Sequence, residues 1–275
     1  MFDTLYNAID LILPFQWLSH TFIAIIIITP LFGLLSTMVV SNKMSFFADS
    51  LGHGAFTGIA VGILLGGIDP MWGATLFSIC FAIAITIIKN KGTSSTDTII
   101  GVFSSTSIAL GLVLMSFSSS LSKFSSYLVG DLLSISQNQI ILLIFVFIAI
   151  IVLWSLIFNK LLVTSLNTSL ANSRGMNTLL IEIIFTCTIA VIVTITIRWV
   201  GLLIINSLLV LPAAASRNIS RNIRQYHLFS ILIAIFSGIV GLIISYYLNT
   251  VTGATIVLVA SVIFFITLFI RRKFL

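Results

Sequence analysis

Apolar residues run along almost the whole chain in stretches long enough to cross a bilayer, with short polar segments between them. A helical span needs about 20 mainly apolar residues, and its backbone must be hydrogen-bonded within the span. The pattern predicts helices at about 17–40, 45–66, 70–88, 97–116, 138–158, 178–198, 200–214, 228–248 and 253–270. The chain is therefore predicted to be an all-α, polytopic transmembrane helical bundle that forms one domain, 1–275.

The seventh run is the weakest of the series. The segment from Arg198 to Gly201 leaves little room for a turn before it, and the run ends at Pro212, so this helix is predicted to be short or broken. The prediction is thus about eight or nine spans. Residues 1–14 mix apolar and polar positions over a length too short to span, which indicates an amphipathic helix on the outer interface.

Composition and charge agree with a membrane location. Of 275 residues, 59% are hydrophobic and 7% are charged, against about a quarter charged in soluble domains. With the predicted spans, one side of the membrane receives Lys43, Lys89, Lys91, Lys160, Arg174, Arg217, Arg221, Arg224, Arg271, Arg272 and Lys273, and the other only Lys123 and Arg198. The positive-inside rule makes the first side cytoplasmic, with the N-terminus outside and the C-terminus inside. The net charge of +6 follows from this topology and gives no reason to expect nucleic acid.

The second span carries a carboxylate and an imidazole, Asp49 and His53, one helical turn apart. Residues at i and i+4 lie on the same side of a helix. Ionisable groups in hydrocarbon cost roughly 2.5 to 3.5 kcal/mol each, so they mark pathways or binding sites by default. Counted from Lys43 at 1.5 Å per residue, His53 lies roughly 15 Å deep, half of a hydrocarbon core of about 30 Å. A pathway role is therefore the favoured interpretation of the pair.

The same span has a glycine at every fourth position: Gly54, Gly58, Gly62 and Gly66. Such a ridge lets another helix approach closely. The alternative interpretation of the second span is thus a tightly packed helix in which the two polar residues are satisfied structurally.

Carboxylate plus imidazole suits divalent ions such as Zn²⁺ or Mn²⁺, whereas Cu⁺ prefers sulfur ligands. One Asp and one His are too few for a closed site, but a homodimer would bring four ligands to a shared axis. A proton relay could use the same two residues.

Two other polar features lie within predicted spans. The run Ser104, Ser105, Thr106 and Ser107 either lines a wet cavity or bonds back to its own helix. Glu182 follows the predicted start of the sixth span, where a carboxylate favours the helix N-terminus and reaches the interface.

Several segments together resemble the integral-membrane permease subunits of ATP-binding-cassette importers for zinc and manganese. The resemblance runs from about residue 30 to 270 and is carried by KMSFFADSLGHGAFTGIAVG (43–62), TDTIIGVFSSTSIALGLVLMS (96–116), YLVGDLL (127–133), VGLLIINSLLVLPAAASRN (200–218) and YYLNTVTGATIVLV (246–259). It implies that Asp49 and His53 contribute an intramembrane metal site. The family usually has Ser and Ala beside the His and a Pro soon after it, where this chain has Gly52, Gly54 and Thr57.

The segment SLNTSLANSRGMN (165–177) resembles the cytoplasmic coupling loop that docks on the ATPase subunit, so residues 165–178 are expected to form that loop. The acidic pair usual near its start is replaced by Asn167, Thr168 and Ser169. The chain has no GxxxxGK[ST] phosphate loop, no HExxH and no GxSxG, so it is not expected to be an enzyme, and ATP hydrolysis is expected on a separate subunit.

The resemblance and the residues together predict a permease of a bacterial cytoplasmic membrane that imports Zn²⁺ or Mn²⁺ as substrate through a homodimer. Its expected partners are a cytoplasmic ATP-binding subunit, an extracytoplasmic metal-binding protein and the lipid bilayer, with no permanently bound cofactor. The alternatives are a permease for an iron chelate and a proton-coupled secondary transporter that works alone.

Overall fold

The computed structural model describes residues 16–65, 70–92, 94–117, 130 and 135–274, and the expected interfacial helix at 1–14 lies outside them. The described residues form helices joined by short turns, with no strand among them. The elements are α2 (Gln16–Ser41), α3 (Phe47–Leu65), α4 (Pro70–Lys91), α5 (Thr96–Ser116), α7 (Gln137–Leu166), α8 (Thr168–Ser173), α9 (Thr178–Val200), α10 (Leu202–Leu208), α11 (Leu211–Ile219), α12 (Ile223–Leu248) and α13 (Thr252–Phe274).

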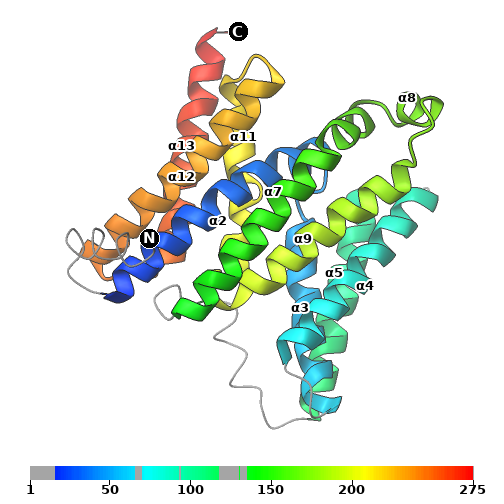
Figure 1. The fold of residues 1–275 in the computed structure, drawn as a ribbon, viewed down its shortest axis with the longest axis horizontal. Helices are drawn as coiled ribbons and strands as arrows, with labels where there is room; N and C mark the ends of the chain where they lie inside the picture. Colours follow the sequence, from blue (N-terminus) through cyan, green and yellow to red (C-terminus); the bar gives the residue numbers. More distant parts are fainter. Residues whose placement is uncertain (1–15, 66–69, 93, 118–129, 131–134, 275) are drawn as a thin grey trace.

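Eight of these helices are long and apolar enough to cross a membrane within the described ranges. The seventh predicted span is broken, because the chain leaves the helix at Leu209 and Val210 and restarts just before Pro212 as α11. A proline within the first turn is tolerated because its missing N–H has no helical partner there. Together α10 and α11 carry the chain from the end of α9 to the start of α12, so they take the place of the seventh crossing (Figure 1).

Helix ends follow local capping signals. Ser95 accepts a hydrogen bond from the Thr98 N–H at the start of α5, and Asn177 does the same for Leu180 at the start of α9. Asn249 ends α12 in the left-handed conformation, with φ of 50°, which Asn tolerates better than most residues. The first two caps therefore begin a span, and the third ends one.

Three helices form the interior of the bundle. About two thirds of the span windows of α2 and α3 (67% each) and α9 (61%) are buried, against 28% in α5, α7 and α13. The largest fully buried side chains include Phe32 of α2, Phe47 of α3 and Phe185 of α9. The helix that carries Asp49 and His53 is therefore central, whereas α5 has an open outer face.

Positive charge gathers at one end of the helices, as predicted. α4 ends with Lys89 and Lys91, and α11 ends with Arg217. Figure 1 shows α8 and the C-terminal end of α13 on the upper side of the bundle and the start of α2 on the lower side. The start of α2 and the end of α13 thus lie on opposite sides of the bundle.

Candidate metal site

Asp49 and His53 occupy the first two turns of α3 and face each other. His53 Nε2 lies 3.5 Å from Asp49 Oδ2, and 23% of the His53 side chain and 36% of the Asp49 side chain are exposed. The first turn of a helix favours a carboxylate, because the unpaired N–H groups there carry partial positive charge. The expected pairing of the two side chains on one side of a helix is confirmed.

Their separation suits a shared ion. Oxygen and nitrogen ligands about 2.0–2.1 Å from a tetrahedral ion lie roughly 3.3 Å from each other. The two side chains therefore reach the spacing of two adjacent ligands with little movement. Among the described residues, no group of three or more His, Cys, Asp and Glu side chains gathers around a common point, so this chain offers two such donors and not a closed set.

The helix that carries His53 starts later than the count from Lys43 assumed. α2 ends at Ser41, Lys43 takes a positive φ of 55°, and α3 begins only at Phe47. Six residues of helix separate Phe47 from His53, which is roughly 9 Å of helix at 1.5 Å per residue. The pair lies in the half of α3 that comes first in the chain.

The glycine ridge of α3 packs against α4. A Cβ atom added to Gly58 would lie 2.6 Å from Ala74 Cα, and one added to Gly73 would lie 2.7 Å from the Gly58 carbonyl oxygen. Gly54 faces the ring of Phe81 and Gly62 faces Pro70 on the same helix. The predicted close approach is confirmed, and α4 lies behind the site, beside the stripe that carries Asp49 and His53.

A second helix, α5, is joined to α3 through two buried hydroxyl groups. Thr57 Oγ1 donates to the Ser107 carbonyl oxygen at 2.6 Å and lies 2.9 Å from Ser107 Oγ, which in turn lies 3.2 Å from the His53 carbonyl oxygen. Thr57 and Ser107 are called the hydroxyl clamp below. Of the four hydroxyls from Ser104 to Ser107, Ser107 thus bonds across helices, whereas Thr106 bonds back to Val102.

Comparison with known proteins decides the family. Residues 14–271 match the ABC 3 transport family. The chain belongs to this family.

Two relatives of this chain are named as zinc or manganese transport proteins. The chain is 30% identical to the high-affinity zinc uptake system membrane protein ZnuB of Buchnera aphidicola subsp. Baizongia pistaciae, over 92% of this chain and 95% of the relative. It is 26% identical to the manganese transport system membrane protein MntC of Listeria monocytogenes serovar 1/2a, over 95% of this chain and 93% of the relative. The fold matches a chain of PsaBC from Streptococcus pneumoniae in complex with Fab, with a TM-score of 0.81, 27% identity and coverage of 96% and 95%.

The protein is a multi-span permease subunit of an ATP-binding-cassette importer in the plasma membrane. It is not itself an enzyme, since ATP hydrolysis in this family resides on a separate subunit. Of the alternatives drawn from the sequence, neither the iron-chelate permease nor the lone secondary transporter is favoured by these relatives.

The permease also contains a charged contact that sequence reasoning missed. The Lys89 ammonium at the end of α4 pairs with a carboxylate oxygen of Glu182 on α9, and Asn90 donates to the other oxygen at 2.7 Å. The Lys89 and Glu182 side chains are 18% and 11% exposed, so the pair is largely shielded by the bundle. The sequence does show a basic residue at the end of α4 and an acidic residue near the start of α9. Only the packing of α4 on α9, however, makes the two side chains neighbours.

The expected coupling loop contains a short helix. Asn167 caps α8 by accepting a hydrogen bond from the Leu170 N–H at 3.0 Å. Apart from Ala171, the residues of α8 are exposed, and Figure 1 shows this helix at one end of the bundle. The outer side of α8 is therefore not covered by other described parts of this chain.

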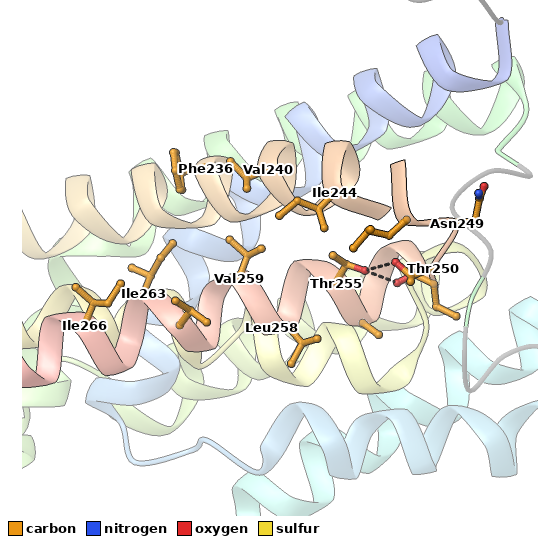
Figure 2. Close-up of a pocket in the computed structure, with 14 residues that line it drawn as sticks. Phe236, Val240, Ile244, Asn249, Thr250, Thr255, Leu258, Val259, Ile263 and Ile266 are labelled. Carbon is orange, nitrogen blue, oxygen red and sulfur yellow. Dashed lines mark hydrogen bonds between the residues drawn. The ribbon is translucent and has the colours of Figure 1, made fainter. Parts of the chain in front are cut away.

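A groove of about 860 Å³ lies elsewhere, between α12 and α13. Figure 2 shows that its walls are apolar, with Asn249, Thr250 and Thr255 at one end, where the two threonine hydroxyls lie 3.0 Å apart. The lining residues include no Asp, Glu, His or Cys. The groove therefore lacks the side chains that bind transition metals best, and it is separate from the Asp49 and His53 pair.

Proposed function

We propose that this permease imports a divalent transition metal ion, Zn²⁺ or Mn²⁺, as a homodimer. The observation that carries the proposal is the carboxylate and imidazole of Asp49 and His53, held 3.5 Å apart in the interior helix of the bundle. Both side chains are partly exposed, so an ion that enters the bundle can reach them. The zinc and manganese names of the relatives support the choice of cargo.

The two-donor site supports the homodimer. A second copy related by a two-fold axis would add a second Asp49 and His53, and four such ligands suit a tetrahedral ion. The outer face of α5, which packs on α3, exposes Val102, Ser105 and Ala109 and so leaves room for a partner. An ion shared between two protomers would be released when they separate, because each protomer alone offers only two of these ligands.

The orientation and the other partners complete the proposal. The clustering of Lys and Arg on the side of α8 and of the last turn of α13 supports a cytoplasmic location for that side and for the C-terminus. The exposed segment 165–178 around α8 then docks on the ATP-binding subunit, and a metal-binding protein delivers the ion from outside. All of 1–275 acts as one permease domain.

Metal binding and uptake by matched variants test the site. Asp49→Ala and His53→Ala are expected to abolish stoichiometric binding of Mn²⁺ and Zn²⁺ by the purified permease and to reduce uptake in cells to background. Asp97→Ala is the control, because Asp97 also lies in the first turn of a helix but is exposed.

Isothermal titration with each ion measures the binding, and uptake of radioactive Mn²⁺ and Zn²⁺ measures transport at matched membrane abundance. Normal binding and uptake by Asp49→Ala would reject the site. If neither Mn²⁺ uptake nor Zn²⁺ uptake saturated as the concentration of the ion is raised, the proposal that these ions are the transported substrates would be rejected.

A further inference from the structure

The hydroxyl clamp lies one turn from His53 and is buried more completely than the site itself. Thr57 is 0% exposed and Ser107 is 3% exposed. Thr57 continues the stripe of α3 that begins with Asp49 and His53, because all three are spaced by four residues. The clamp therefore attaches α5 to the same face of α3 that carries the two proposed ligands.

Each of the two hydroxyl groups of the clamp donates one hydrogen bond to the other helix. Each hydroxyl has one proton to donate and can accept as well. The shortest contact, 2.6 Å, assigns the Thr57 proton to the Ser107 carbonyl oxygen of α5. The Ser107 proton then points back to α3, where Thr57 Oγ1 lies at 2.9 Å and the His53 carbonyl oxygen at 3.2 Å. One hydrogen bond thus runs in each direction between the helices.

The space around the clamp is closely filled. A Cβ atom added to Gly111 would lie 3.0 Å from Thr57 Oγ1, so the glycine admits the Thr57 side chain between the two helices. On the opposite flank of α3, Gly58 is in contact with α4. The helix turn that carries His53 is therefore held from both sides, by a hydroxyl pair and by backbone packing.

We infer that Thr57 and Ser107 are positioning residues for the metal pair, which rests on the proposed function above. They act through the backbone of His53: the clamp sets the position of this helix turn against α5 and so keeps the imidazole at ligand spacing from Asp49. Metal ligands tolerate only small changes of distance, and groups behind the ligands commonly account for 10- to 100-fold in affinity. Because its side chains are neutral, the clamp positions the helix turn of His53 without adding a charge beside the bound cation.

Two hydroxyl pairs of the same kind join helices elsewhere in the bundle. Ser36 and Ser230 lie 2.9 Å apart between α2 and α12, and Thr86 and Thr186 lie 3.0 Å apart between α4 and α9. All four side chains are fully buried. The double variant Thr57→Val/Ser107→Ala removes both hydroxyls of the clamp, and Ser36→Ala/Ser230→Ala removes both hydroxyls of a pair that does not involve Asp49 or His53.

Dissociation constants for Mn²⁺ and Zn²⁺ are measured by titration of the full-length permease in detergent, on protein that shows a cooperative melting transition. The clamp double variant is expected to raise both constants about tenfold, at the low end for groups behind metal ligands. The control double variant is expected to leave them within about twofold even where its melting temperature falls. The conservative variant Thr57→Ser keeps the donor and is expected to bind like the wild type.

Two results would overturn the inference: wild-type affinity in the clamp double variant, or an equal loss in the control pair. If the double variant is not recovered folded, Thr57→Val and Ser107→Ala alone decide, each with an expected rise of about threefold. If Asp49→Ala loses metal binding but the clamp double variant keeps the wild-type dissociation constants, the positioning role is rejected and the metal site is retained. Retained binding in Asp49→Ala rejects the metal site as well.

Discussion

The hydroxyl clamp between α3 and α5 and the ion pair between α4 and α9 both join neighbouring helices through shielded polar side chains, but only the second contains charge. The clamp lies beside the proposed cation ligands and is neutral. The carboxylate of Glu182 is matched by the Lys89 ammonium and held further by Asn90. The hydroxyl clamp thus adds no charge beside Asp49. In the ion pair between α4 and α9, by contrast, the charges of Lys89 and Glu182 cancel each other.

The same contrast predicts different costs when each contact is broken. A hydroxyl that loses its partner costs about 1–3 kcal/mol, whereas a charge left alone in a shielded place costs about 3–5 kcal/mol. The ion pair should therefore dominate the stability of the bundle, and the clamp should dominate the precision of the site. Three predictions test this contrast, beginning with the largest effect.

Removal of Lys89 should have the largest effect on stability. Lys89→Met leaves the Glu182 carboxylate without its cation, which we expect to destabilise the permease by about 3–5 kcal/mol. The double change Lys89→Met/Glu182→Met should recover most of this loss, because no charge remains unpaired. Melting curves of the purified variants measure the effect, with Lys91→Met, an exposed neighbour, as the control. A Lys89→Met protein as stable as the control would show that the pair is already well solvated.

A side chain on the glycine ridge should have an intermediate effect. Gly58→Ala places a Cβ atom 2.6 Å from Ala74 Cα, so α3 and α4 must separate. Overpacking of this kind costs about 1–3 kcal/mol, and the shift of α3 should also weaken Mn²⁺ binding.

The matched control for Gly58 is Gly101→Ala on α5, where an added Cβ atom meets nothing within 4 Å. Alanine favours a helix over glycine by about 0.8–1.0 kcal/mol, so this control should be neutral or stabilising. Equal melting temperatures for the two variants would contradict the close contact of α3 with α4.

The smallest effect concerns the coupling energy within the clamp. A double-mutant cycle on Thr57→Val and Ser107→Ala should give about 0.5–1.5 kcal/mol, the net contribution of hydrogen bonds between neutral groups. The same cycle on Lys89 and Glu182 should give a clearly larger value. Chemical denaturation of the four proteins in each cycle provides the energies. If the clamp coupled as strongly as the ion pair, the distinction between positioning and stabilising contacts would fail.

Much of the candidate site was predictable, because it depends on spacing along one helix. The i, i+4 placement of Asp49 and His53 and the close approach at Gly58 follow from helix geometry alone. The depth of His53 stays a prediction, but the count behind it treated the chain from Lys43 as helical, whereas α3 starts at Phe47. The hydropathy pattern placed a break between 40 and 45, but it does not state at which residue the next helix begins.

Contacts between separate helices were not predictable. Thr57 and Ser107 are 50 residues apart, and Lys89 and Glu182 are 93 apart. Single-sequence patterns describe one helix at a time and do not state which faces meet. Glu182 was therefore interpreted from its own helix end, and Ser107 was left with two interpretations.

By itself, the sequence determined the membrane class, the predicted run of eight or nine spans, the side on which positive charge gathers and the two residues best suited to bind a cation. These properties depend on composition and short-range periodicity, which the bilayer and the helix impose on any chain. The structure confirmed the broken seventh run as α10 and α11. Only the tertiary structure decided that hydroxyls of α3 and α5 lie beside the turn of His53 and that a balanced ion pair joins α4 to α9. Those properties depend on which helices pack together, and packing is a relation between distant residues.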